Sequence, residues 1–449
     1  MTGSGETGRT RLTPNRPLLL TNAIIGGSGR CAAAFNLERS QQNARRSADS
    51  LWCTDMNNTL LEQFVARLNS NVFFGEFAFP SAHLKIPGRG EVELADHLVL
   101  LDDIGLIFQL KERDESAPST AEALANWFKA KVRRKAVQQV GDTRRMLIEH
   151  AGAAIPNDRG EPVLLPLTPP SHVACVVVYA APAHPSFQPP RFHVSKTAGF
   201  VHFIHADDYL GVCQALATPT EVLDYLTFRE QAVPSIALAP AAVPEAALVG
   251  QFMGGDLSAV PNARFAGVID ALLDDRDDWD LSFLTAQLGS KIIFIEGSHA
   301  DNSHHRILAE LAKLSRSELG EIKARLRLTL EAVERDELRL PYRFTSPRTG
   351  CGFLLFPVTT ALRSTYRIAL NNYSIASKHE QALTKHISAA VMKHGSSIDI
   401  VWAFQAGPHR PNPDVDALLA ANYPFRPLRE AVKPRYRFDS DGLRDALGS

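Results

Sequence analysis

The pattern of apolar and polar positions between residues 59 and 152 predicts a helix, three strands and a second helix. Apolar residues at helical spacing follow the capping box Thr59-Leu-Leu-Glu62, which marks the start of a short amphipathic helix. Alternating aromatic or aliphatic residues predict strands at Val72 to Phe79, Glu93 to Leu101 and Gly105 to Glu112. A second capping box, Ser119-Thr-Ala-Glu122, opens a helix that is expected to continue, bent near Gly141, to His150.

The last two of these strands are joined by Asp102-Asp103-Ile104-Gly105, a composition typical of a tight hairpin. Because successive side chains of a strand point to opposite faces, Gln109 and Lys111 share one face. A two-residue turn, at either Asp102-Asp103 or Asp103-Ile104, places Asp96 opposite Gln109 or Lys111 on that face. A three-residue turn without a bulge would reverse the pairing, so the predicted cluster depends on the turn.

Asp96, Gln109 and Lys111 together carry the groups that hydrolysis of a phosphodiester needs. A divalent cation polarises the phosphate and lowers the pKa of a bound water, and a nearby positive charge orients the attacking hydroxide. The carboxylate of Asp96 and the amide carbonyl of Gln109 are hard oxygen ligands, which suit Mg²⁺, with Mn²⁺ as the substitute. The ammonium of Lys111 supplies the point charge.

Two segments, Glu93-Leu-Ala-Asp96-His-Leu-Val-Leu and Leu106-Ile-Phe-Gln109-Leu-Lys111, resemble the PD-(D/E)xK nucleases, especially their Mrr-like and NERD-like branches. The resemblance implies a restriction-endonuclease-like core, a mixed sheet flanked by helices, that cuts DNA in defence against foreign DNA. It implies that Asp96 and Gln109 hold the metal and that Lys111 assists the nucleophile. Gln109 stands where the commonest family pattern has an acid.

The resemblance also implies two contributions from the neighbouring helices. An acidic residue on the preceding helix would be a further metal ligand, namely Glu62, with Glu76 as a substitute. Glu62 has a second interpretation as the last residue of its own capping box. A glutamine on the following helix would be Gln139 or Gln138. Because Gln109 is neutral, the alternative function is a catalytically inactive nuclease fold that binds nucleic acid or a protein partner.

Basic residues gather on the predicted helix that follows the hairpin. The cluster consists of Lys129, Lys131, Arg133, Arg134, Lys135, Arg144 and Arg145, and in the sequence only Asp142 opposes it. Since the net charge of the whole chain is −1, a case for a nucleic-acid partner has to come from such a local patch. We expect Arg133, Arg134 and Lys135, with Gln139, to contact DNA.

The chain as a whole is predicted to be α/β, with a flexible extension at residues 1–55, a nuclease-like domain at 56–152 and a larger mixed α/β region at 153–449. This larger region begins where prolines become frequent after Gly152, and it is expected to divide near 240–250. Near its end, strands at Phe353 to Val358 and Ile398 to Phe404 are expected to flank a helix from about Ser374 to Lys393.

Other classes of protein are disfavoured by the composition. The five cysteines stand far apart without a C-x-x-C pair, which argues against a disulfide scaffold and favours the reducing cytoplasm. The apolar runs fall short of the roughly 18 to 20 residues that a membrane span requires, and the N-terminus shows no secretory signal. Self-association into a homo-oligomer is left open. The string His299, Asp301, His304 and His305 matches no metal motif and is interpreted as a capping loop before a helix.

Overall fold

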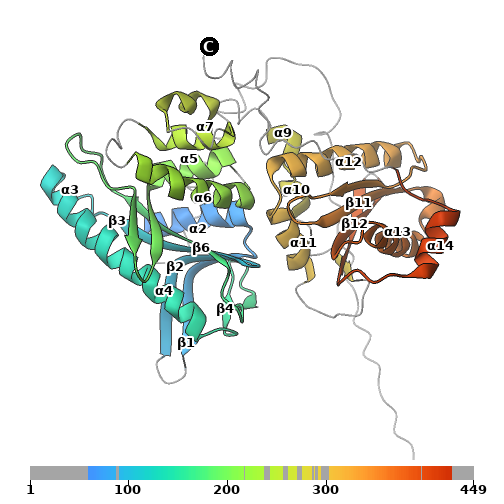
Figure 1. Ribbon diagram of the computed structural model, residues 1–449, viewed down its shortest axis with the longest axis horizontal. Helices are drawn as coiled ribbons and strands as arrows, with labels where there is room; N and C mark the ends of the chain where they lie inside the picture. The colour runs from blue at the N-terminus through green and yellow to red at the C-terminus, as the bar shows by residue number, and fades with distance from the viewer. Residues whose placement is uncertain are drawn as a thin grey trace, which may run out of the picture.

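The chain folds into two mixed α/β units, each built around its own sheet, as Figure 1 shows. The computed structural model describes residues 59–86, 90–216, 218–236, 243–255, 261–269, 276–285, 288, 292–294, 303–395 and 397–426. The mixed α/β class predicted from the sequence is confirmed, while the extension at 1–55 lies outside the described residues. Within the described part, none of the helices combines the length and the apolar character that a bilayer crossing needs.

The first unit, residues 59–269, contains a six-stranded sheet in the order β1-β2-β3-β6-β8-β7. Its strands are β1 (Ala78–Ile86), β2 (Gly90–Leu101), β3 (Ile104–Glu112), β6 (His172–Ala180), β7 (Phe192–Ser195) and β8 (Gly199–His205). The first three form an antiparallel meander, β6 lies parallel to β3, β8 lies parallel to β6, and β7 closes the far edge in the antiparallel direction. A small hairpin, β4 (Ala154–Pro156) and β5 (Pro162–Leu164), stands beside this sheet.

Helices cover both faces of this sheet, because its strands carry buried apolar residues on both sides. One face packs against α2 (Leu60–Phe73), α5 (Ala206–Leu216), α6 (Pro219–Ser235), α7 (Glu245–Met253) and the short 3-10 helix η3 (Ala263–Gly267). The other face packs against one continuous helical run of three segments, α3 (Ala121–Trp127), η1 (Phe128–Ala136) and α4 (Val137–Glu149). The hairpin strands β2 and β3 therefore lie between two helical layers.

Two of the predicted boundaries in this region are wrong. The strand expected to begin at Val72 begins at Ala78, because α2 continues to Phe73 and ends where Phe74 adopts a positive φ of 64°. The helical run passes through Gly141 to Glu149, and its departure from α-helical geometry lies earlier, in the π-helical η1. At Gly141 a Cβ atom would lie 2.9 Å from Thr197 Oγ1, so the glycine allows close packing there.

The domain boundaries expected at 152 and near 240–250 both fall inside the first unit. Beyond residue 152, β6 pairs with β3 over its full length, so the two regions share one sheet. Near 240–250, helix α7 packs into the same apolar core as α2, and that core extends to Val268. The second unit begins after this point.

The second unit, residues 276–426, contains a five-stranded sheet in the order β10-β11-β12-β13-β9. Its strands are β9 (Ile292–Phe294), β10 (Tyr342–Thr345), β11 (Cys351–Val358), β12 (Lys385–His394) and β13 (Ser397–Ala406). Its helices are α9 (Arg276–Trp279), α10 (Ser282–Thr285), α11 (Ser303–Ala312), α12 (Arg316–Glu334), α13 (Tyr366–Glu380), α14 (Pro413–Ala421) and the short η5 (Thr360–Leu362). The helix expected from Ser374 to Lys393 is wrong in its second half, which forms the buried strand β12.

Apolar packing and ion pairs join the two units. Phe77 and Leu101 of the first unit belong to the apolar core of the second. Arg316 at the start of α12 forms a fully buried ion pair with Glu221 of α6, with Nη2 2.7 Å from Oε2. Removal of either partner would leave an uncompensated buried charge, so this pair fixes the two units against each other.

Candidate active site

The β2–β3 hairpin turns through two residues, as the predicted cluster requires. Leu101 pairs with Ile104 across the turn Asp102-Asp103, and the ladder ends at its other side with the pair His97 and Phe108. Asp96 and Gln109 are the next residues on the two strands. On the opposite face, Phe108 belongs to the apolar core that includes α2.

The side chains of Asp96, Gln109 and Lys111 converge on one point. Lys111 Nζ lies 3.2 Å from Asp96 Oδ2 and 3.3 Å from Gln109 Oε1. Gln109 is buried, and the side chains of Asp96 and Lys111 are 9% and 13% exposed. The ammonium group therefore bridges two oxygen atoms, a carboxylate and an amide carbonyl, that a divalent cation would also accept as ligands.

Backbone groups of β3 hold this arrangement in place. The N–H of Leu110 donates to Asp96 Oδ2 at 2.6 Å, and Lys111 Nζ donates to the Leu110 carbonyl at 2.8 Å. A side-chain carboxylate thus replaces a backbone partner of β3 just beyond the point where the pairing of β2 and β3 ends. Charge-assisted hydrogen bonds of this kind fix the carboxylate more strongly than neutral ones.

Glu93 is a further acidic residue of the site, which sequence reasoning missed. Burial raises the pKa of its carboxyl group most, and the charge of Asp96 raises it further. Glu62 raises the pKa less than His83 lowers it, and Lys111 lowers it least. Two carboxylates, those of Glu93 and Asp96, therefore act on each other here, an arrangement that favours the binding of a cation.

Glu62 lies in α2, which packs on the sheet face of Phe108 and not on that of Ile107, and it already has a structural role. Its carboxylate Oε2 accepts from the Thr59 N–H at 2.8 Å, and its own N–H donates to Thr59 Oγ1 at 3.3 Å, so the predicted capping box is present. The proposed substitute, Glu76, lies near the turn end of the hairpin and pairs with Arg159 at 3.4 Å. Of the two, Glu62 is the acid that acts on Glu93 beside Asp96.

Gln139 occupies the side of α4 that faces β2. One turn later, Thr143 Oγ1 donates to the Leu94 carbonyl of β2 at 2.5 Å. Gln139 is partly buried, and its Oε1 atom has no hydrogen-bond partner within the described residues. Gln138 is exposed. Gln139 is therefore the glutamine that fits the position expected from the sequence, with an acceptor available for a ligand.

The exposed basic residues gather on η1. Lys129, Lys131, Arg133, Arg134 and Lys135 are all exposed, and an open hollow of about 360 Å³ is lined by Asn126, Lys129, Ala130, Arg133, Arg134 and His193. Burial and the charge of Arg133 lower the pKa of His193. The segment is π-helical over nine residues, a geometry that is frequent at functional sites.

Arg144 and Arg145 do not belong to this exposed cluster. Arg144 Nη1 donates to the Ala198 carbonyl at 3.0 Å, and Arg145 pairs with Asp142 at 2.9 Å and with Glu149 at 3.7 Å. The cluster predicted from the sequence is therefore reduced to its η1 part.

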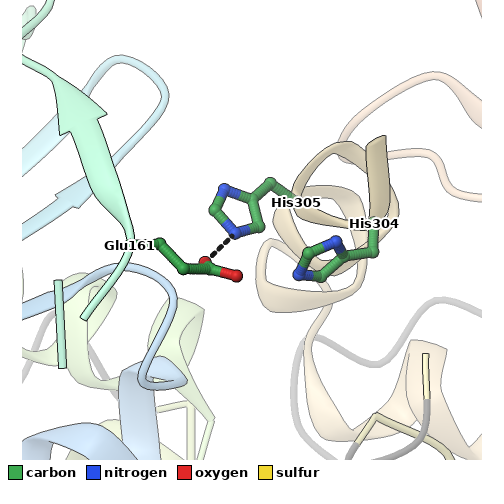
Figure 2. A group of neighbouring side chains, drawn as sticks. All are labelled: Glu161, His304 and His305. Carbon is green, nitrogen blue, oxygen red and sulfur yellow. Dashed lines mark hydrogen bonds and ion pairs between the residues drawn. The ribbon is translucent and has the colours of Figure 1, made fainter. Parts of the chain in front are cut away.

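A second group of potential metal ligands, Glu161, His304 and His305, lies between the units (Figure 2). His305 Nε2 is 3.0 Å from Glu161 Oε2. Burial and the charge of His305 lower the pKa of His304. Burial raises the pKa of Glu161, but hydrogen bonds from Asn157 and His305 outweigh that effect, and its pKa lies below the ordinary value.

The sequence interpretation of this histidine string was incomplete. His304 and His305 lie within the first turn of α11 and not in a loop before it, whereas His299 and Asp301 lie outside the described residues. The third member, Glu161, is 144 residues away from His305. No local spacing motif contains it, and only the packing of the two units brings it close.

Comparison with known proteins does not identify a family or a function for these residues. No protein-family model matches the chain, and no curated protein matches it. A function for the chain therefore has to be inferred from its own residues.

Proposed function

We propose that this protein is a metal-dependent nuclease that hydrolyses DNA phosphodiester bonds at Asp96, Gln109 and Lys111. The observation that carries the proposal is the convergence of three groups on one hairpin. The ammonium nitrogen of Lys111 lies 3.2 Å from the carboxylate of Asp96 and 3.3 Å from the amide carbonyl of Gln109. The surrounding arrangement supports it, since the hairpin belongs to a mixed sheet with helices on both faces, as in the nuclease family that the motif resembles.

The donor atoms at this site fit a hard divalent cation. Asp96 offers a carboxylate, Gln109 an amide oxygen, and Glu93 a second carboxylate whose pKa is raised by burial and then by the charge of Asp96. Oxygen ligands of this kind suit Mg²⁺ or Mn²⁺. The metal would polarise the phosphate and lower the pKa of a water molecule.

The protein's own groups perform the remaining tasks. Asp96 and Gln109 hold the cation, and their oxygens are already fixed by the Leu110 N–H and by the hairpin register. Lys111 orients the attacking water through its ammonium group and stabilises the negative charge that develops on the phosphate. Glu93 adds negative charge beside Asp96.

The exposed basic residues of η1 supply a surface for the DNA backbone. By strand alternation, Gln109 and Lys111 share the sheet face of Ile107, and Ile107 packs in the same core as the η1–α4 helix. Phosphate contacts from Arg133, Arg134 and Lys135 would therefore lie on the helix that covers the catalytic face, and such contacts supply most of non-specific affinity.

Plasmid cleavage tests the proposal directly. Supercoiled DNA is incubated with the full-length protein and Mg²⁺, beside the variants Asp96→Asn and Lys111→Ala. We expect both variants to lose on the order of 10²-fold in rate, since each removes a charge that acts on the transition state. The matched control is Asp103→Asn, an exposed acid in the same hairpin, which is expected to cleave as the natural chain does. Equal cleavage by all four proteins would remove this site from the reaction.

A second candidate function is favoured by the neutral Gln109. The ammonium of Lys111 already donates hydrogen bonds to the oxygens of Asp96 and Gln109, so these two groups have a partner without a metal. Such an arrangement suits a fold that binds nucleic acid without cutting it. Tight DNA binding without cleavage in either Mg²⁺ or Mn²⁺ would support this inactive module.

We place either function in the reducing cytoplasm, which suits the buried free thiols of Cys175, Cys213 and Cys351.

A further inference from the structure

We propose that Glu161, His304 and His305 form a Zn²⁺ site that joins the two units. Glu161 directly precedes β5 in the small hairpin of the first unit, and both histidines lie in the first turn of α11 in the second unit. Figure 2 shows the carboxylate and the two imidazole rings side by side between these elements. This inference is independent of the proposed nuclease activity.

The distances suit one small ion. In a tetrahedral zinc site with bonds of about 2.0 to 2.1 Å, neighbouring ligand atoms lie roughly 3.3 Å apart. His305 Nε2 and Glu161 Oε2 are separated by 3.0 Å, and the ligand atoms of all three residues lie within 4.8 Å of one another. Small rotations of the side chains therefore suffice to place all three around one ion.

The chemistry of the ligands selects the kind of ion. Two imidazoles with one carboxylate are typical of zinc and related transition metals, whereas Mg²⁺ prefers an all-oxygen set. Three protein ligands leave a fourth tetrahedral position for water. The two metal sites of this protein therefore differ in preference, with a hard ion at Asp96 and a borderline ion here.

Neighbouring groups hold the ligands in position, as they do around established metal sites. Asn157, which is buried, donates from Nδ2 to Glu161 Oε2 at 3.2 Å, while its Oδ1 accepts from the Glu161 N–H at 2.8 Å. The ring of His305 packs edge-on against Phe77, with the ring centroids 5.9 Å apart. The carboxylate and one imidazole are thus fixed before any ion binds.

A simple ion pair is the competing explanation, and the chain provides an example for comparison. His379 Nε2 contacts Asp416 Oδ1 at 2.8 Å in the second unit. Among the described residues, this pair is not part of a group of three ligands within 4.8 Å. It therefore serves as a matched control, because it has the histidine and carboxylate contact without the third ligand.

Zinc binding by the full-length protein tests the inference. After removal of metals with a chelator, the protein is titrated with Zn²⁺ by calorimetry, and bound zinc is measured by elemental analysis. We expect one equivalent in the natural chain and a loss of about tenfold or more in affinity in Glu161→Gln, His304→Ala and His305→Ala. Glu161→Gln keeps the shape of the side chain, so the test does not depend on a disruptive variant. His379→Ala is expected to bind zinc as the natural chain does.

Two further readouts separate this site from the proposed nuclease site. Tetrahedral Co²⁺ should give visible absorption bands in the natural chain that Glu161→Gln lacks, and Zn²⁺ should raise the midpoint of thermal unfolding of the natural chain but not that of Glu161→Gln. Asp96→Asn should bind zinc normally. Zinc binding that is absent in the natural chain, or unchanged in the three ligand variants, would overturn the inference and leave an ordinary contact between the units.

Discussion

The site on the β2–β3 hairpin and the site between the two units differ in how their charge is balanced. At the hairpin, Asp96 and Gln109 already share an internal cation, the ammonium of Lys111. Between the units, the carboxylate of Glu161 contacts the neutral amide of Asn157 and the imidazole of His305, a group that can give up its proton to a metal. At the hairpin, Lys111 balances the charge of Asp96 without a metal. Between the units, the balance of the charge of Glu161 depends on whether the histidine is protonated or an ion is bound.

The proposed catalytic site therefore lies within one unit, and the proposed zinc site spans both. The hairpin site is built within 16 residues of one strand pair, so it should keep its geometry when the second unit moves. The site between the units brings together residues from both, so its occupancy should report how the units are placed. Four experiments break or sharpen this contrast.

The largest expected effect comes from the buried ion pair that joins the units without a metal. Arg316→Met leaves Glu221 charged and fully buried, so we expect a loss of about 3 to 5 kcal/mol in the free energy of unfolding. The measurement is urea denaturation of the metal-free protein. The control is Arg348→Met, since Arg348 and Asp224 also pair across the units but are 34% and 22% exposed, and we expect a change of about 0 to 1 kcal/mol. Similar losses in both variants would show that burial does not distinguish the two pairs.

The next effect is a pH dependence of the free energy of unfolding, caused by His97 in the hairpin. Burial lowers the pKa of His97 from 6.5 to about 3, so between these values the unfolded chain binds a proton that the folded chain does not. The resulting stability is fully present above pH 6.5 and is lost as the pH falls. For this residue alone we expect a loss on the order of 2 to 3 kcal/mol from pH 7 to pH 4.5.

His97→Phe should remove that part of the acid sensitivity. Both ring nitrogens of His97 are buried without a hydrogen-bond partner among the described residues, and the ring contacts Phe108 edge-on, so phenylalanine suits the position. The readout is the difference in unfolding free energy between pH 7 and pH 4.5. A variant with the same pH dependence as the natural chain would contradict the assignment to His97. The buried His386, whose pKa is also lowered to about 3, remains as an internal reference in both proteins.

A smaller effect distinguishes the metal preferences of the two sites. Gln109→Glu adds a carboxylate beside Asp96, and we expect Mg²⁺ to support cleavage at about tenfold lower concentration, equivalent to about 1.4 kcal/mol. Zinc binding at Glu161 should stay the same, because the change lies in the other site. The Mg²⁺ concentration at half-maximal cleavage is the quantity to compare. An unchanged Mg²⁺ requirement would argue that Gln109 does not hold the cation.

The smallest effect concerns DNA affinity. Arg133→Ala and Arg134→Ala should each weaken binding severalfold and reduce the slope of log affinity against log salt by about 1. Arg145→Ala is the control, because Arg145 is already paired with Asp142 and Glu149 on the same helical run. Fluorescence anisotropy with a short duplex at several salt concentrations measures both quantities. If Arg145→Ala weakened binding as much as the η1 variants, the phosphate surface would extend beyond η1.

The hairpin could be predicted because all the information lies within a short stretch. The parity of Gln109 and Lys111, with a two-residue turn, determines that Asp96 faces them. Glu93 could not be found in this way, since a register shift between Ala82 and His83 interrupts the regular alternation of β2 against β1.

The features that local sequence patterns did not predict depend on contacts between distant parts of the chain. Strand β12 is buried along most of its length between two neighbours, so it lacks the alternation of a half-exposed strand, and its alanines resemble a helix in the sequence. The boundary expected at 152 rested on prolines, whereas the pairing of β3 with β6 depends on residues from both sides of that point. Glu161 and His305 meet only because the two units pack together.

The parallel pairing of β3 with β6 also sets a limit on how the protein can be shortened. A fragment that ended at residue 152 would lose the neighbour of β3 along the whole strand, from Ile104 to Glu112. The N–H and C=O groups of that edge would be open to other chains, and a long apolar strand edge promotes aggregation. During synthesis on the ribosome, the β2–β3 hairpin would likewise gain its neighbour β6 only after residue 180 had emerged.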